Sequence, residues 1–496
     1  MKKAIKIVSL ILCLCLLFSS CSGNTGKEET TSDELMSENQ QNVGTENNYN
    51  EKITLPYNRT DGLNPFFAKS YENTYICALL FQPLYLTDST YTANTVIAES
   101  INVTDKTATV RLRQGVVCRD SSIINAEDVV YSFNMAKQSY VWSEALNNIV
   151  SAQAVGMYTV EFTLNHKDIY TSGKLNFPVV KAGTADEETS IPTGSGLYYF
   201  QDEKLISSLN EEKIIYLSPI GTRDSAENAM NIGATDVFFN DMAECNYTAT
   251  SSTKYDVQLN NMVYLGLNNS NGALNNYIRN AIAAKIDSEK IALSSYQGHA
   301  TAVKLPINPD SNIAGEVTVI KTTGNVDLAN NIIDRCGYTR YSGRAKTNGA
   351  YVLSFYLIVN KENKFRVAAA YNIADSLNEC GFLITVQTLP FDEYMERIAS
   401  GNFDMYLGEV KLDYSMDISQ FFSSGDPLNS GIDADGIAAT QYFKYRAGEI
   451  TPTEYYEIFA EDYPFIPVVF RKGYVATSDK VKLNLKETPY NLYNGL

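Results

Sequence analysis

The sequence predicts an α/β fold with parallel strands in the second half of the chain. Residues 351–360 are continuously apolar, as in a buried strand, and residues 364–380 have the pattern of a helix that Gly381 ends. A strand, a helix and another strand follow over short joints, at 383–389, 391–400 and 403–410. Strands that alternate with helices in this way pair in parallel through right-handed crossovers.

The first twenty residues have the pattern of an export signal. Basic residues at 1–6 precede an apolar run at 7–18 that is too short to span a bilayer, and two serines follow. Cys21 comes directly after these serines, an arrangement that resembles the lipobox of bacterial lipoproteins, in which the cysteine is acylated. We therefore expect residues 1–20 to be a lipoprotein signal peptide and Cys21 to carry the lipid. Ordinary secretion with an unmodified Cys21 is the alternative.

Residues 22–50 are rich in Ser, Thr, Asn, Glu and Gln and have almost no large apolar side chain. Such a segment buries too little surface to fold, so we expect residues 21–50 to form a flexible, lipid-anchored tether. As a coil it would span roughly 30 Å. The folded part would then be held at the extracytoplasmic face of the cell membrane, with the N-terminal lipid as its only membrane contact.

Charge and composition exclude several classes of function. The formal net charge is −17, and removal of residues 1–20 would bring it to −20, which disfavours binding to nucleic acid or to anionic lipid. The two histidines, His166 and His299, and five scattered cysteines after Cys21 form no metal-ligand pattern. A cell-surface hydrolase would need a nucleophile–base pair or a metal cluster, so we expect no catalytic residue, no metal and no cofactor.

Two alternating segments predict a module of strands and a helix over residues 86–180. Residues 107–113 and 158–164 alternate apolar and polar side chains, as half-buried strands do. Between them, Asn125 precedes an acidic first turn and an apolar face, the pattern of a capped helix.

The sequence predicts a further folded part of the chain that begins with an apolar strand at residues 262–267. The following helix, predicted over 273–286, has a stripe of apolar side chains four residues apart: Leu274, Ile278, Ile282 and Ile286.

The segment after the strand at 403–410 is the candidate ligand site. Ligands of open parallel sheets bind beyond the carboxyl ends of the strands. Charges of both signs and an aromatic ring gather there: Glu409, Lys411, Asp413, Tyr414 and Asp417. Asp413 could bind a ligand ammonium, and Lys411 a ligand carboxylate. The alternative is a solvated loop, or an internal pair between Lys411 and Asp413 of little energetic value.

Several stretches, in order along the chain, resemble the oligopeptide/dipeptide-type (family 5) solute-binding proteins of bacterial ABC uptake systems. The most specific are VRLRQGV at 110–116 and NAEDVVYSF at 125–133. Others are DGLNPF at 61–66, LLFQPL at 79–84, PTGSGLY at 192–198, and the segments 264–287 and 464–470.

This resemblance implies a two-lobed periplasmic-binding-protein-like clamp of type II with an extra inserted α+β module. Lobe I would comprise residues 51–85, 181–262 and 471–496, the inserted module 86–180, and lobe II 263–470. The lobes would close on the ligand, and the permease subunits of an ABC transporter would recognise the closed form.

The resemblance also implies roles for individual residues. Asp413 and Tyr414 match the family segment that holds the ligand amine, although Lys411-Leu412 replaces its usual Gly-Trp. Asn64 and Phe66 would contribute to the opposite wall. We therefore expect a monomeric solute-binding protein that delivers a small ligand, most simply a short peptide, to an ABC uptake permease. The alternative is a sensor lipoprotein that presents a signal peptide or sugar to a receptor without transport.

Overall fold

The structure, a computed structural model, describes residues 52–243, 253–317, 324–340, 345–481 and 492–493. The predicted signal peptide, Cys21 and the predicted tether lie outside these residues. Buried apolar side chains of the described chain form two hydrophobic cores, which we call core A and core B. Core A is drawn mostly from residues 55–217, and core B mostly from residues 220–476.

Core A contains two four-stranded sheets. The first has the order β1 (Ile53–Asn58), β10 (Ile214–Ile220), β9 (Lys204–Ser207) and β8 (Tyr198–Gln201). Helix α2 (Tyr71–Leu80) packs against it and begins at Ser70, whose hydroxyl accepts a hydrogen bond from the backbone of Asn73. The second sheet is antiparallel, with the order β4 (Ala98–Thr104), β5 (Thr107–Leu112), β7 (Thr159–Leu164) and β6 (Ile149–Gly156).

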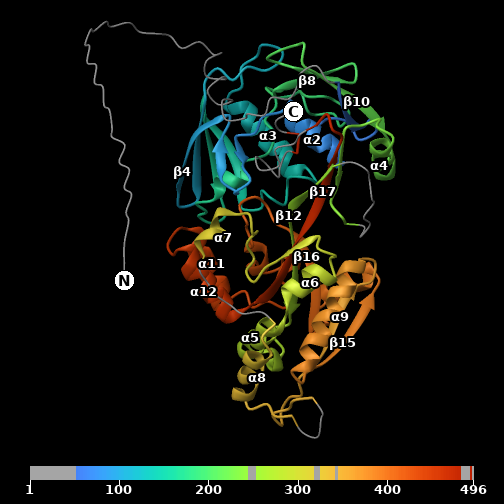
Figure 1. Ribbon diagram of the computed structural model, residues 1–496. Helices are drawn as coiled ribbons and strands as arrows, with labels where there is room; N and C mark the ends of the chain where they lie inside the picture. The colour runs from blue at the N-terminus through green and yellow to red at the C-terminus, as the bar shows by residue number, and fades with distance from the viewer. Residues whose placement is uncertain (1–51, 244–252, 318–323, 341–344, 482–491, 494–496) are drawn as a thin grey trace, which may run out of the picture. The chain divides into compact units, whose positions relative to one another are not determined.

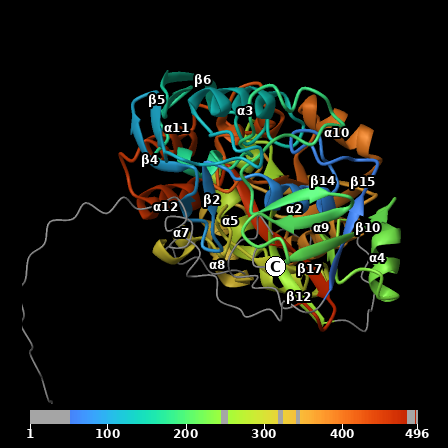
Figure 2. The ribbon, with the colours of Figure 1, turned by 90° about the horizontal axis from the view of Figure 1, so that it is seen from above.

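The strands and the helix predicted within residues 86–180 are confirmed. Strands β5 and β7 match the two alternating segments, and α3 (Ala126–Gln138) lies between them in the chain. Asn125 caps α3, and the Asp128 side chain returns a bond to the backbone of Asn125, which completes a capping box. Helix α3 packs on β6 and β7, as the view from above shows (Figure 2). Their apolar side chains join those of the first sheet in core A. A short ribbon, β2 (Tyr85–Thr87) with β3 (Ala93–Thr95), leads into this part.

Core B contains a mixed seven-stranded sheet. Its order is β11 (Val237–Asn240), β17 (Phe465–Thr477), β12 (Thr253–Leu267), β16 (Met405–Lys411), β14 (Ser354–Asn360) and β15 (Leu383–Leu389), with β13 (Ala300–Ala302) beside β17. Strand β14 pairs in parallel with both β15 and β16, as predicted. The remaining pairs are antiparallel, so only part of this sheet has the predicted parallel arrangement.

The helices of core B follow the predicted order with one shift. Helices α9 (Lys364–Glu379) and α10 (Phe391–Ala399) connect the parallel strands. The helix predicted from residue 273 begins later, because Asn275 caps α5 (Asn276–Lys285) after a single 3₁₀ turn. The other helices are α4 (Arg223–Asn231), α6 (Ser288–Ser294), α7 (Asn312–Glu316), α8 (Val326–Arg335), α11 (Ile437–Arg446) and α12 (Pro452–Asp462). Across the described ranges, we find no helix with both the length and the apolarity that a membrane crossing requires.

Strands β12 and β17 connect the two cores. They run antiparallel to each other from Thr253 to Gly266 and lie side by side through the middle of Figure 1. Val257 of β12 and Val475 of β17 belong to core A. The part of β12 nearer its carboxyl end belongs to core B. Strand β16 pairs with β12 in core B and ends at Lys411, so the segment that follows it lies where the two cores meet.

Candidate functional site

A cavity of about 400 Å³ is lined by side chains from both cores. The wall on the side of core A is aromatic, with Tyr71 and Tyr75 from α2 and Tyr140 and Trp142 from the segment after α3. The lining on the side of core B comes from the end of β16 and the segment after it: Lys411, Leu412, Asp413, Tyr414 and Asp417. Binding sites for small ligands typically enclose about 300–1,000 Å³ and combine apolar walls with a few polar groups. The cavity has this character, and we call it the central pocket.

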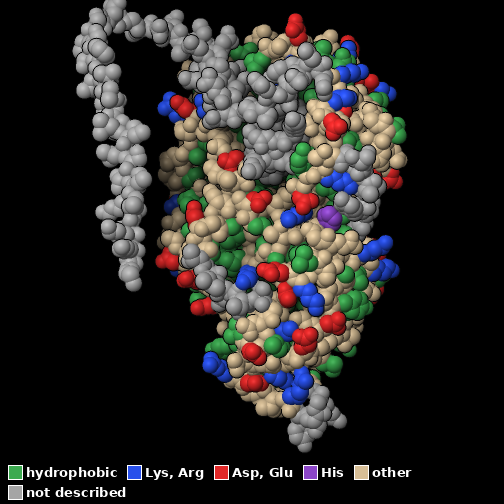
Figure 3. Space-filling model, in the orientation of Figure 1, with side chains coloured by type: hydrophobic (Ala, Val, Ile, Leu, Met, Phe, Trp, Pro, Cys, Tyr) green, Lys and Arg blue, Asp and Glu red, His purple; other side chains and the backbone are tan. Residues whose placement is uncertain are grey.

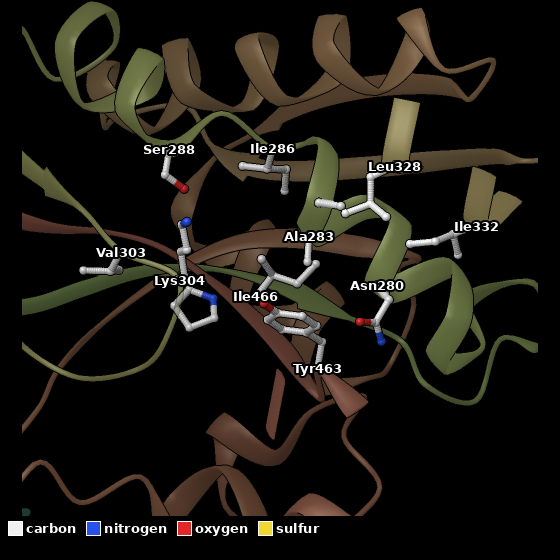
Figure 4. A pocket seen from close by; sticks show the side chains of 12 residues that line it. Asn280, Ala283, Ile286, Ser288, Val303, Lys304, Leu328, Ile332, Tyr463 and Ile466 are labelled. Atoms are coloured by element: carbon white, nitrogen blue, oxygen red, sulfur yellow. The ribbon is translucent and has the colours of Figure 1, made fainter. Parts of the chain in front are cut away.

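A second cavity lies within core B and is smaller, at about 160 Å³. Figure 4 shows its lining side chains, among them Leu328 and Ile332 of α8, Ala283 of α5, and Tyr463 and Ile466. All of its lining residues lie between Asn280 and Pro467, so it does not join the two cores. The central pocket is therefore the better candidate for a ligand that contacts both.

A buried ion triad lies at the base of the central pocket. The Lys174 ammonium is 2.6 Å from Asp413 Oδ2 and 2.8 Å from Asp417 Oδ2. The side chain of Lys174 is 0% exposed and that of Asp417 is 2% exposed. Burial alone would lower the pKa of Lys174, but the negative charges of Asp413, Asp417 and Asp168 raise it above its ordinary value. The Lys174 ammonium therefore stays charged at neutral pH.

A second buried pair supports the same segment. Arg446 of α11 is 2.6 Å from Asp168 Oδ2, and both side chains are fully buried. The Arg446 guanidinium also donates to the backbone oxygen and the hydroxyl of Ser415. Burial would raise the pKa of Asp417, but the positive charges of Lys174 and Arg446 hold it well below its ordinary value. These charges fix the position of the segment between Asp413 and Asp417.

Local backbone geometry brings Lys174 to this segment. Residues Thr171–Lys174 form a single 3₁₀ turn, and Gly173 lies directly against Ser415. A Cβ atom at Gly173 would come within 3.1 Å of the Ser415 Cβ, so this close approach favours glycine. On the other side, Met416 has φ of 53°, a left-handed turn that redirects the chain into the 3₁₀ turn at Ser419–Phe422.

Besides Asp417, two charged side chains of the central pocket have shifted pKa values. The Lys411 side chain remains accessible to solvent, yet partial desolvation in the pocket lowers its pKa; Asp241 and Glu144 oppose this effect and Arg471 adds to it. Desolvation raises the pKa of Glu144, and the negative charges of Asp426 and Asp413 act in the same direction. Figure 3 shows acidic and basic side chains interspersed over one face of the molecule.

The structure brings four of the predicted site residues together. Lys411, Asp413, Tyr414 and Asp417 all line the central pocket. Asp413 is engaged by Lys174 at one oxygen, and by the backbone and hydroxyl of Ser415 at the other. The internal pair between Lys411 and Asp413 that the sequence left open is not formed among the described residues, and Asp413 pairs with Lys174 instead.

The other three predicted residues do not line this pocket. Glu409 lies on β16 at 2.7 Å from Arg471, and it also accepts a hydrogen bond from Asn261 of the neighbouring strand. Asn64 is completely buried and donates to the backbone oxygens of Ala185 and Glu187. Phe66 is 2% exposed and belongs to core A. The contacts of these three side chains described above are all made within the protein.

Sequence reasoning missed the aromatic wall and Lys174. One feature of the sequence could have indicated the aromatic wall. Tyr140 and Trp142 lie two residues apart, and Trp142 is the only tryptophan of the chain. Tyr140 is 87% exposed, so its ring is accessible to a ligand in the central pocket. Nothing in the local pattern around Lys174 indicates its role.

Known proteins show which family this arrangement belongs to. A family model of bacterial extracellular solute-binding proteins, family 5 (middle), matches residues 92–431. The chain belongs to this family. Over 549 aligned residues it is 21% identical to the oligopeptide-binding protein AppA of Bacillus subtilis (strain 168), covering 99% of this chain and 98% of that protein.

Solved structures show a similar fold. The structure described as a nickel ABC transporter from Bacillus halodurans has a TM-score of 0.72 at 17% identity, covering 90% of this chain and 99% of that chain. The unliganded open form of the periplasmic murein tripeptide-binding protein MppA has a TM-score of 0.71 at 18% identity, covering 89% and 96%. The predictions of a family 5 protein and of its two-lobed α/β fold are confirmed.

Proposed function

We propose that this family 5 protein captures short peptides in the central pocket and delivers them to the permease of an ABC importer. The observation that carries the proposal is the pocket itself, which lies where the two cores meet and combines an aromatic wall with charged groups. Its relatives are binding proteins, and one of them is an oligopeptide-binding protein that aligns over nearly the whole chain. The protein would act by binding and release, without catalysis, and as a monomer.

We propose that the pocket closes by movement of two lobes. The predicted lobe I (51–85, 181–262 and 471–496), together with the inserted module at 86–180, would carry the aromatic wall, and lobe II (263–470) would carry the segment after β16. The two cores joined by β12 and β17 support this division except at residues 220–262, whose buried apolar side chains belong mostly to core B. A ligand that contacts both walls favours the closed form over the open one, because it gains its full contacts only there.

Peptide binding is expected to change the fluorescence of Trp142. This side chain lines the central pocket, and it is the only tryptophan of the chain, so a signal reports on this site alone. Titration of purified protein with a mixed tripeptide library should change the emission, and native mass spectrometry should detect the bound peptides. Tyr140→Ala should weaken binding by about two- to tenfold, since an aromatic contact contributes about 0.5–1.5 kcal/mol.

The matched control is Tyr277→Ala, which removes the same side chain at another exposed position outside the pocket. It should bind peptides as the unaltered protein does. If neither fluorescence nor mass spectrometry detects a bound peptide, the peptide assignment is wrong. Hydrolysis of the added peptides would instead show an enzyme.

We also propose that Cys21 is acylated and anchors the protein at the extracytoplasmic face. Cys21→Ser should then release the protein from the membrane fraction and abolish incorporation of labelled palmitate. Ser20→Ala, which keeps the cysteine, should leave both unchanged. If the Cys21→Ser protein carries no label but stays in the membrane fraction, the lipid is not what anchors the protein.

A further inference from the structure

We infer that Lys174 fills, from within the protein, the place that a ligand ammonium would take between Asp413 and Asp417, and that Lys411 holds the ligand through a carboxylate instead. The inference rests on the proposed function and specifies its ligand class. The ligands would be peptides or acylated amino acids with a free carboxylate, whether or not their amino end is blocked.

Every oxygen of the two carboxylates already accepts a hydrogen bond within the protein. Both Oδ2 atoms accept from the Lys174 ammonium. Asp413 Oδ1 accepts from the backbone and the hydroxyl of Ser415. Asp417 Oδ1 accepts from the backbone of Ser419 and the hydroxyl of Tyr442. A ligand ammonium at this place would have to displace a buried cation and leave it without a partner, which is strongly unfavourable.

The packing around Lys174 keeps it in place. Its side chain is fully buried, and Gly173 beside it touches Ser415. Its ammonium is also within 3.4 Å of the backbone oxygen of Ala145, so it has a third acceptor. The pocket therefore presents Asp413 and Asp417 as carboxylates whose hydrogen bonds are already made within the protein, although one ammonium between two carboxylates leaves the triad with one negative charge.

The cations on the wall of the central pocket are the groups still open to a ligand. Lys411 and Lys69 both line it, and both side chains are exposed. Within the described part of the chain, neither forms an ion pair. Glu144 is the remaining acid on the wall, and no ion pair joins it to Lys411 or Lys69 within the described residues. A ligand carboxylate beside Lys411 would gain a charge-assisted hydrogen bond, while its apolar body packs against Tyr71, Tyr75 and Trp142.

The test compares four forms of one tripeptide library: free, N-acetylated, C-amidated and blocked at both ends. Binding to the full-length protein is measured by Trp142 fluorescence. Acetylation should change the affinity less than about twofold, and amidation should weaken it about tenfold or more, the effect of losing one charge-assisted bond. In Lys411→Met the free-acid and amide forms should bind equally, whereas Lys361→Met, at an exposed lysine outside the pocket, should keep the difference.

Three results would overturn the inference. If acetylation weakens binding about tenfold and amidation does not, the ligand ammonium displaces Lys174, and peptide binding as such still stands. If Lys411→Met and Lys361→Met change the difference in affinity between the free-acid and amide forms equally, Lys411 is not the group that binds the ligand carboxylate. If none of the four forms binds, the proposed peptide function fails and the inference fails with it.

Discussion

Replacing Lys174 with methionine should lower the free energy of unfolding by about 3–5 kcal/mol, the usual cost of removing one partner from a buried ion pair. The change leaves Asp413 and Asp417 without the cation that contacts both of them. Methionine nearly matches the length of the lysine side chain, so the loss comes from charge and not from an emptied space. Urea unfolding followed by circular dichroism measures the effect.

Two further variants identify the cause. Lys361→Met makes the same substitution at an exposed position and should change the unfolding free energy by less than about 0.5 kcal/mol. Adding Asp417→Asn to Lys174→Met should recover part of the lost stability, because it removes one of the two uncompensated charges while keeping the side-chain shape. A further loss of stability in this double variant would contradict the electrostatic explanation.

Replacing Phe421 with alanine should cost about 3–5 kcal/mol of unfolding free energy. Its ring is fully buried and stacks on Phe465 of β17 with the ring centroids 4.1 Å apart, and it meets Tyr264 of β12 edge-on at 5.0 Å. Alanine would leave a cavity beneath the 3₁₀ turn at Ser419–Phe422, directly after Asp417. The same urea measurement reports the loss.

The matched control is Phe391→Ala at the start of α10, where the ring is 51% exposed. It should change the unfolding free energy by less than about 0.5 kcal/mol. Because Phe421 supports the wall of the central pocket, its alanine variant should also weaken peptide binding, which Phe391→Ala should not. Equal stability of the two variants would show that the stacked rings contribute little.

Local sequence patterns predict those helices and strands whose boundaries are marked by neighbouring residues in the chain. The strand–helix alternation between β14 and β16 was predicted to within a few residues, because apolar runs and glycines after the helices mark its boundaries. The capped start of α3 was predicted from Asn125 and the acids behind it, and the structure confirms the full capping box. Both signals depend on neighbours in the chain, which the sequence shows directly.

The length of strand β12 is predicted wrongly, because its first part depends on a partner that is distant in the chain. We expected a strand at residues 262–267, but it begins at Thr253. Its first part is polar and has no apolar run, yet residues 253–258 pair with residues 472–477 of β17. The long backbone ladder between these strands stabilises that part, and no local pattern reveals a partner more than two hundred residues away.

The sequence by itself determined the family, the α/β rhythm and the charged segment at residues 411–417. Only the tertiary structure decided which of those charges a ligand can use. Lys174 lies 239 residues before Asp413 in the chain, yet its ammonium is 2.6 Å from the carboxylate. The strength of an ion pair depends on distance and burial in space, which separation along the chain does not give. For that reason Asp413 could be predicted as a site residue, while its partner could not.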